Sequence, residues 1–179
     1  MSHQTTKFVP LNIAVLTISD TRNEQTDTSG ALLVNELTDS GHHAYAKEIV
    51  QDNVYDIRAV ISKWIADDKI QAIVCTGGTG FTARDNTPEA ISVLFDKNVE
   101  GFGELFRQIS YDEIGTSTVQ SRALAGMAND TVIFCLPGST NACRTGWNKI
   151  IKEQLDASHR PCNFVPHLNL DEQACTTRN

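Results

Sequence analysis

Three continuous apolar runs mark the chain, and each of them ends in small or polar residues. The runs are Asn12–Ile18, Ile70–Cys75 and Thr131–Leu136. They are rich in β-branched side chains, and unbroken apolar runs of this length are typical of strands buried on both faces of a parallel sheet. A weaker strand is expected at Ala44–Val50. The pattern therefore predicts a sheet whose strands end in polar residues.

Between the strands, apolar positions recur at helical spacing. Residues 27–29 offer caps for a helix that Gly41 stops, and residues 51–53 lead into a second amphipathic helix. Each helix would lay one apolar stripe against the sheet. The stripes comprise Leu32, Leu33 and Leu37 in the first helix, and Ile57, Val60, Ile61, Trp64 and Ile65 in the second.

The second half of the chain is less uniform. Helices are expected at residues 88–95 and from about 141 to 154, whereas the segment through Gly101, Gly103 and Tyr111 shows no clear period and is expected to be less regular. Strands that alternate with helices predict an α/β fold with several parallel strands in a doubly wound sheet.

Parallel sheets of this kind bind ligands outside the carboxyl ends of their strands. We therefore expect the loops after Ile18, Val50, Cys75 and Leu136 to converge on one site. Each of these loops contains glycine residues or residues with hydroxyl or carboxylate side chains.

Length, composition and net charge limit the number of domains and the classes of partner that the protein can bind. With 179 residues, of which 40% are hydrophobic, the chain is long enough for a full core, and we expect one domain over residues 1–179 with surface or interface tails at 1–10 and 156–179. A formal net charge of -7 argues against nucleic acid as a partner, because phosphate backbones bind clustered Lys and Arg. No run approaches the roughly 18 apolar residues of a membrane span, so no membrane association is expected. A cytoplasmic location is the matching expectation.

The cysteines point the same way. They form no Cys-x-x-Cys pair, which favours buried free thiols in a reducing compartment over disulfides or zinc sites. Cys75 lies in a β-branched strand, so a raised pKa and an inert thiol are expected there. The cysteines are Cys75, Cys135, Cys143, Cys162 and Cys175.

The glycine-rich turn Thr76–Gly80 is the strongest functional signal. It follows a buried strand, and its glycines let backbone N–H groups converge on an oxyanion without obstruction by Cβ atoms. Asp85 follows, just before a helix start in which Thr87 is expected to cap and Pro88 to fill the first position. This arrangement predicts a phosphate site with a carboxylate beside it.

Two common phosphate motifs do not fit. A Walker A loop ends in Gly-Lys-Ser/Thr, but Gly80 is followed by Phe81, so no lysine reaches a terminal phosphate. A dinucleotide fingerprint is formally met by Ala83, but Arg84, Asp85 and Pro88 interrupt the helix that should already have begun. An ordinary P-loop NTPase or a nicotinamide enzyme is therefore disfavoured.

Some residues allow two interpretations. Asp85 either serves a metal-bound phosphate or is a helix-terminus aspartate that the dipole stabilises by about 0.3 to 1 kcal/mol. Arg84 either contacts a phosphate or pairs with a surface acid, and Arg122 is similar. Trp64 and Trp147 lie on apolar helix faces and are expected in the core.

Several short motifs follow one another along nearly the whole chain. They are Thr17-Ile-Ser19-Asp20, Asp27-x-Ser29-Gly30, Thr76–Gly80, Arg84-Asp85-x-Thr87-Pro88-Glu89, Gly101–Glu104, Ile114–Thr118, Ser121-Arg122, Leu136-Pro137-Gly138 and Cys143-Arg144. Together, these motifs resemble the MoaB/Mog family of molybdenum cofactor biosynthesis proteins, and most closely its bacterial MoaB branch.

The resemblance implies binding of molybdopterin and, in active members, transfer of adenylate from Mg-ATP to the terminal phosphate of the pterin. It also implies a three-layer α/β/α domain around a mainly parallel sheet, assembled as a homotrimer or a dimer of trimers. Asp85 and Asp52 resemble the catalytic carboxylates that hold Mg²⁺. The residues that the resemblance implies for pterin and nucleotide binding are Thr17, Ser19, Asp20, Thr76, Gly77, Gly78, Thr79, Gly80, Thr87, Glu89, Ser121, Arg122, Pro137, Gly138 and Ser139.

One departure leaves the function open. The common Pro-Gly-x-Pro of the family is here Pro137-Gly138-Ser139-Thr140, without the second rigid proline. A noncatalytic carrier or assembly subunit that holds the pterin is therefore the alternative to an adenylyltransferase. No motif decides between ATP and GTP.

Overall fold

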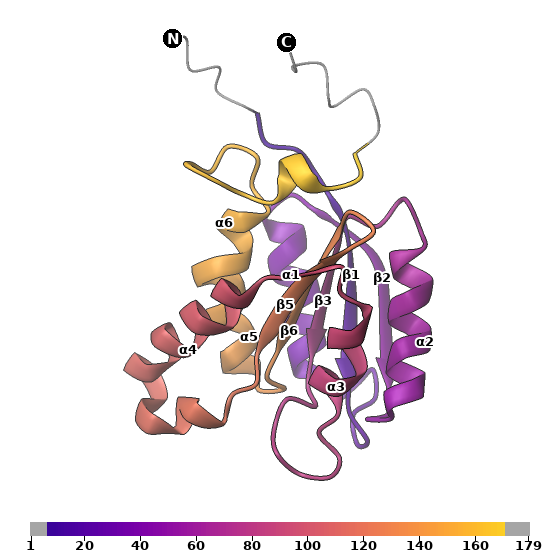
Figure 1. Cartoon of the computed structure of the whole chain (residues 1–179), viewed down its shortest axis with the longest axis vertical. Coiled ribbons are helices and arrows are strands. Elements are labelled where there is room, and N and C mark those ends of the chain that lie inside the picture. Colours follow the sequence, from indigo (N-terminus) through magenta and orange to yellow (C-terminus); the bar gives the residue numbers. More distant parts are fainter. Residues whose placement is uncertain (1–6, 171–179) are drawn as a thin grey trace.

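The computed structural model describes residues 7–170, and its centre is a six-stranded mixed sheet (Figure 1). The strand order is β2-β1-β3-β6-β5-β4. Strands β2, β1, β3 and β6 are parallel, whereas β5 and β4 are antiparallel at one edge. The strands are β1 (Asn12–Ile18), β2 (His43–Val50), β3 (Ala72–Thr76), β4 (Lys97–Asn98), β5 (Leu124–Ala128) and β6 (Thr131–Leu136).

Helices cover both faces of the sheet, which confirms the predicted three-layer α/β/α fold. One face carries α1, α4 and the segment from α5 to α6, and the other carries α2 and α3 (Figure 1). The helices are α1 (Thr28–Asp39), α2 (Val54–Ile65), α3 (Thr87–Ile91), α4 (Glu100–Ile114), α5 (Thr140–Gly146) and α6 (Lys152–Gln154). A π-helix (Trp147–Ile151) joins α5 to α6, and 3₁₀ turns lie at Ser92–Leu94, Gly115–Gln120 and Val165–His167.

The alternation of strand side chains builds two cores. In β1, Ile13 and Val15 pack into the core under α1 and α4, whereas Ala14, Leu16 and Ile18 pack into the core under α2 and α3. Because both faces are covered, the central strands are apolar throughout, as the sequence pattern predicted. Trp64 and Trp147 are buried in these cores, as expected.

The segment expected to be less regular is in fact the 15-residue helix α4. Its two glycines lie in the first turn, where they interrupt little of the helix. Phe102, Phe106 and Ser110 are buried at a spacing of four residues and hold one face of α4 against the sheet. Gly103 is close to the backbone, since a Cβ there would lie 2.5 Å from the Ala123 carbonyl oxygen.

Two smaller expectations are corrected. Thr87 does not cap α3; the cap position is Asn86, and the Thr87 hydroxyl donates instead to the Gly77 carbonyl oxygen at 2.8 Å. Residues 156–179 were expected to form a surface or interface tail, but within the described part of this segment Ala157, Val165 and Leu168 are buried in the core. Residues 1–6 and 171–179, which include Cys175, lie outside the described part of the chain.

The described cysteines are free thiols, and Cys75, Cys135 and Cys143 are buried as expected. Burial raises the pKa of the Cys75 thiol, with a further contribution from Cys135 on the neighbouring strand, which confirms the predicted direction. Cys162 is exposed, contrary to expectation, because it lies in the irregular segment after α6. Within residues 7–170, no helix has the length and apolar character needed to cross a membrane.

Candidate functional site

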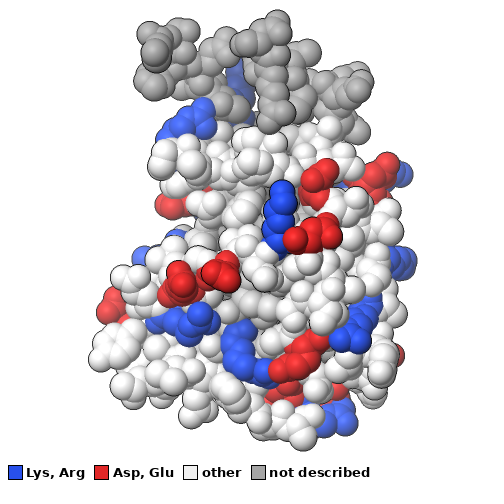
Figure 2. Space-filling view, viewed as in Figure 1, with Lys and Arg blue, Asp and Glu red and all other residues white. Residues whose placement is uncertain are grey.

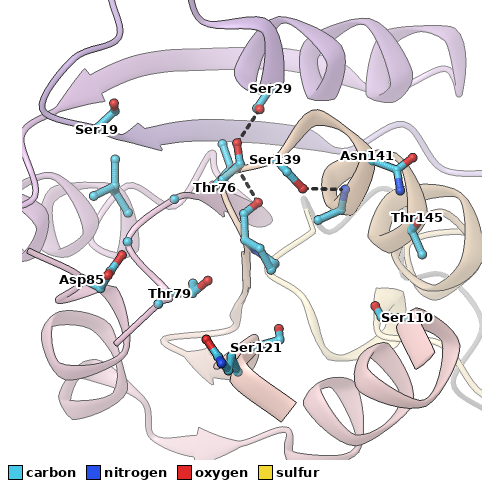
Figure 3. Close-up of a pocket in the computed structure, with 18 of the residues that line it drawn as sticks. Ser19, Ser29, Thr76, Thr79, Asp85, Ser110, Ser121, Ser139, Asn141 and Thr145 are labelled. Atoms are coloured by element: carbon cyan, nitrogen blue, oxygen red, sulfur yellow. Dashed lines mark hydrogen bonds between the residues drawn. The ribbon is translucent and has the colours of Figure 1, made fainter. Parts of the chain in front are cut away.

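A cavity of about 460 Å³ opens at the carboxyl edge of β1, β3 and β6. The loops that follow these three strands form one side of it, and α4, the 3₁₀ turn after α4 and the first turns of α5 form the other (Figure 3). The predicted residues that line the cavity are Thr17, Ser19, Thr76, Gly77, Gly78, Thr79, Gly80, Asp85, Ser121, Pro137, Gly138 and Ser139.

The two glycine turns meet inside this cavity, as the sequence predicted. Gly77 and Gly78 have φ of +105° and +62°, a conformation that other residues rarely adopt. The Gly77 N–H donates to the Leu136 carbonyl oxygen at 3.0 Å, and a Cβ on Gly138 would lie 3.2 Å from the Gly77 Cα. The backbones of both turns therefore touch, and a side chain on Gly138 would crowd this approach.

Hydroxyl groups fasten these turns to each other. Thr76 donates to the Pro137 carbonyl oxygen at 3.0 Å, and Ser29 on α1 donates to the Gly138 carbonyl oxygen at 2.8 Å (Figure 3). Ser139 caps α5 by accepting from the Ala142 N–H. The two hydroxyl-to-carbonyl bonds and the Ser139 cap together fix the shape of the loops.

Asp85 reaches the cavity from the far end of the glycine loop. Its Oδ2 accepts from the Thr82 N–H at 2.8 Å and from the Thr82 hydroxyl at 2.6 Å. The Thr82 hydroxyl bond lowers the pKa of Asp85 more than partial burial raises it, and Arg122 adds to the lowering. Asp85 is therefore ionised at neutral pH.

Asp52 lies directly behind the glycine turn. It is buried, and its Oδ1 accepts from the Asn86 N–H at 3.0 Å. Burial raises the pKa of Asp52, and the like charges of Asp85 and Asp20 raise it further. A Cβ on Gly78 would lie 2.5 Å from the Asp52 Oδ2, so the carboxylate packs closely against the turn.

The remaining predicted residues, Asp20, Thr87, Glu89 and Arg122, also lie outside the cavity lining, in the layer that supports the loop. Arg84 donates to both carboxylate oxygens of Asp20, at 2.9 and 2.6 Å, so it pairs with an acid. Asp20 Oδ1 in turn accepts from the Asp52 N–H at 3.1 Å. This ion pair connects the loop after β1 to the loop after β3.

Arg122 holds the loop between Gly80 and Asp85. Its guanidinium donates to the Gly80 and Asp85 carbonyl oxygens, both at 2.8 Å, and forms an ion pair with Glu89. The guanidinium also lies over the Phe81 ring, 5.1 Å from its centroid. Each of the three guanidinium nitrogens of Arg122 thus donates to the protein, so this residue supports the loop that carries Asp85.

Arg122→Lys is expected to lower the free energy of unfolding by about 2 kcal/mol, because one ammonium group cannot reach both carbonyl oxygens and Glu89 together. Urea denaturation of both proteins measures the loss. Arg84→Lys is the control, since the Arg84 side chain is 65% exposed and solvent screens its ion pair with Asp20. Equal losses in the two variants would contradict the assigned role of Arg122.

Several cavity residues had not been predicted as ligand contacts. Asp27 caps α1, is buried and accepts from Thr17, from the Gly30 N–H and from Lys47 at 2.9 Å. Burial favours the neutral form of Asp27, but the bonds from Lys47, Gly30 and Thr17 outweigh it and lower its pKa. The other additions include Ser29, Ser110, Glu113, Asn141 and Thr145. The only sequence signal for the last four was polar spacing of three and four residues on adjacent helices.

Comparison with known proteins identifies the family. A family profile described as a probable molybdopterin binding domain matches residues 14–157. Molybdenum cofactor biosynthesis protein B of Escherichia coli K12 is 57% identical over 168 residues, which cover 94% of this chain and 99% of that protein. The chain belongs to the MoaB/Mog family of molybdenum cofactor biosynthesis proteins. Its function therefore lies in molybdenum cofactor biosynthesis.

Other members of the MoaB/Mog family agree with this assignment. Molybdenum cofactor biosynthesis protein B of Bacillus subtilis is 43% identical over 142 residues, covering 79% of this chain and 84% of that protein. A crystal structure of a molybdenum cofactor biosynthesis protein B has a TM-score of 0.80 at 43% identity and covers 82% of this chain and 92% of its own. The tungsten cofactor synthesizing protein MoaB from Pyrococcus furiosus has a TM-score of 0.73 at 38% identity, with coverages of 80% and 92%.

Proposed function

We propose that the protein binds molybdopterin and a purine nucleoside triphosphate at this cavity and transfers adenylate from ATP to the terminal phosphate of the pterin. In this reaction a pterin phosphate oxygen bonds to the α-phosphorus, and the bond from that phosphorus to the β-phosphate oxygen breaks to release pyrophosphate. The observation that carries the proposal is the meeting of two glycine turns and the Asp85 carboxylate in one cavity. Transfer of this kind depends mainly on positioning and electrostatic stabilisation.

The charges around the cavity indicate how phosphate would be held. Asp27, Asp85 and Glu113 line it together with one cation, Arg22, and Asp27 is already paired with Lys47. Figure 2 shows basic and acidic side chains beside one another on the visible face. A polyphosphate would therefore depend on local N–H groups of the glycine turns and on a divalent cation.

The carboxylates suit Mg²⁺ that arrives with the nucleotide. Within residues 7–170 no group of three or more His, Cys, Asp or Glu side chains could hold a metal on its own. Asp52 and Asp85 instead pack against the two ends of the glycine turn, at Gly78 and Gly80. Mg²⁺ is commonly bound by one or two carboxylates together with substrate phosphates and water. When bound, Mg²⁺ would neutralise charge on the phosphates.

A noncatalytic pterin carrier remains the second candidate function. It is favoured by the turn Pro137–Thr140, in which Thr140 replaces the second proline of the family motif and contacts the Thr28 hydroxyl at 2.9 Å. Incubation with molybdopterin, Mg²⁺ and ATP separates the two functions. Pyrophosphate release over many turnovers supports the enzyme, whereas stoichiometric pterin binding without release supports the carrier.

Asp85→Asn is expected to lower the rate of Mg²⁺-dependent pyrophosphate release by about tenfold to a hundredfold, because it removes one negative ligand. The fold should be retained, since asparagine keeps an oxygen to accept from Thr82. Pyrophosphate assays over a range of Mg²⁺ concentrations measure the effect. Asp39→Asn, at the exposed end of α1, controls for loss of a surface charge. An unchanged rate in Asp85→Asn would refute the carboxylate role.

The proposal also includes a homotrimer or a dimer of trimers in the cytoplasm. Exposed Tyr111, Ile114 and Val119 on α4 and the following turn offer apolar surface near the cavity mouth. Light scattering of the purified protein distinguishes a trimer from a hexamer.

A further inference from the structure

The cavity has a second polar side, opposite the glycine turns. Ser110 and Glu113 come from α4, and Asn141 and Thr145 come from α5. Figure 3 shows Ser110, Asn141 and Thr145 on the side of the cavity away from Ser19, Thr79 and Asp85. One carboxylate, Glu113, is the charged group of this second side.

The Glu113 carboxylate is held in a fixed orientation. Its Oε1 accepts from the Thr145 hydroxyl at 2.9 Å, and its Oε2 accepts from the Asn141 amide at 2.8 Å. A carboxylate offers about four lone-pair directions, so each oxygen can accept one more bond. Glu113 is therefore arranged to receive two neighbouring N–H donors from a ligand and to repel ring nitrogens that carry lone pairs.

We propose that Glu113 recognises the edge of a 2-amino-4-oxo pyrimidine ring, in which a ring N–H and an exocyclic amino group lie side by side. Pterin and guanine share this edge, and its two donors match the two oxygens of a carboxylate. Adenine places a lone-pair nitrogen beside its amino group, so it would offer Glu113 one donor and one repulsive contact. The inference rests on the proposed function in taking a phosphorylated ring compound as the ligand.

The position of Glu113 suits a ligand with a ring at one end and phosphate at the other. Ile114, next to Glu113 on α4, lines the cavity and is exposed, so it provides apolar surface for a ring face. The glycine turns face the same space and supply the phosphate end. A cavity of about 460 Å³ lies within the range of about 300 to 1,000 Å³ that encloses small ligands.

A purely structural role for Glu113, as a link between α4 and α5, is the competing explanation. Glu113→Gln separates the two, because glutamine keeps an oxygen for the Thr145 hydroxyl but replaces one acceptor by a donor. A structural role would change stability and leave the preference among ring edges unmoved. If Glu113 recognises the ring edge, Glu113→Gln would change the preference among ring edges without a change in the stability of the protein.

The test is calorimetric titration with 6-hydroxymethylpterin phosphate, GTP, ITP, ATP and pyrophosphate, each with Mg²⁺. ITP is the matched probe, because it keeps the ring N–H of GTP and lacks only the 2-amino group. We expect the unmodified protein to bind GTP or the pterin phosphate about tenfold more tightly than ITP. Glu113→Gln should weaken binding of the preferred ligand by about tenfold to a hundredfold and reduce the GTP preference over ITP to nearly one.

Asp112→Asn is the control, since Asp112 is an exposed neighbour on α4 outside the cavity lining. If the protein binds the pterin phosphate but not GTP, the ring that Glu113 recognises is a pterin. If it binds GTP but not the pterin phosphate, the ring is guanine. Unchanged affinities and preference in Glu113→Gln would overturn the inference while leaving the proposed function intact. Binding of pyrophosphate alone, with no ring compound bound by the unmodified protein, would overturn both.

Discussion

Gly77→Ala is expected to lower the free energy of unfolding by about 4 kcal/mol, which sums backbone strain and overpacking. A Cβ at this position would lie 2.1 Å from the Ile18 carbonyl oxygen, far inside any allowed contact. That oxygen belongs to the backbone of β1 and cannot rotate away. The φ of +105° adds strain for any residue with a side chain.

The same substitution should also disrupt ligand binding. Gly77 lies where the ends of β1, β3 and β6 meet, so movement of its backbone widens the gap between the two glycine turns. Urea denaturation and phosphate-ligand titration measure the two losses.

Gly101→Ala is the matched control for Gly77→Ala. A Cβ on Gly101 meets no atom within 4 Å, and the residue lies in the first turn of α4. This variant is expected to gain up to about 1 kcal/mol of stability. Comparable losses in the two variants would show that the turn at Gly77 tolerates a side chain.

Strands were predictable because their apolar runs are long and their ends are marked. The runs at Asn12–Ile18 and Thr131–Leu136 match β1 and β6 residue for residue. Burial on both faces removes the need for polar positions, and glycine or polar residues mark the edge. The same signals predicted that the loops after β1, β3 and β6 would converge, but the loop after Val50, which was also expected there, does not line the cavity.

The antiparallel edge of the sheet gave no comparable signal. β4 has only two residues, and β5 contains Gly126 and an unbranched Met127. These strands are defined by their pairing with β6 and with each other, which is a tertiary property. Helix α4 was not predicted, because the glycines near its start indicate an irregular segment. Its apolar stripe stabilises a helix only when it packs against the sheet.

For the candidate site, the sequence motifs locate the loops but not the side from which each residue acts. Asp85 and Asp52 are both aspartates near a strand end, yet the structure places Asp85 in the cavity lining and Asp52 behind the turn. Glu113 was missed because nothing local relates α4 to α5. Local sequence motifs predict turns that the backbone forms. They do not predict which side chains of two different helices meet, because that depends on the tertiary structure.

The stability of the fold is expected to fall by on the order of 3 kcal/mol as the pH is lowered from about 6.5 to about 4, through His42. His42 is 3% exposed, and its Nδ1 accepts from the Leu11 N–H at 3.2 Å, so the neutral ring carries its proton on Nε2. Burial lowers the pKa of His42 to about 4; Asp156 opposes this lowering, and His43 adds to it.

The sign follows from which state binds the proton. Between about pH 6.5 and 4 the unfolded chain protonates this histidine, whereas the folded chain keeps it neutral between Phe8 and Trp147. The stabilisation is therefore fully present above the unfolded pKa and is lost as the pH falls towards the folded one. The lowered pKa values of Asp20, Asp27 and Asp85 affect stability only near and below 3.8, so they do not dominate this window.

Urea denaturation of the unmodified protein and of His42→Asn at several pH values from 7 to 4.5 measures this contribution. Asparagine keeps an oxygen to accept from the Leu11 N–H but does not titrate, so the variant should lose most of the slope of unfolding free energy against pH. His167→Asn, at an exposed position, should retain that slope. If the unfolding free energy of His42→Asn fell as much at low pH as that of the unmodified protein, the loss of stability would arise from other titratable groups, since the variant differs only at residue 42.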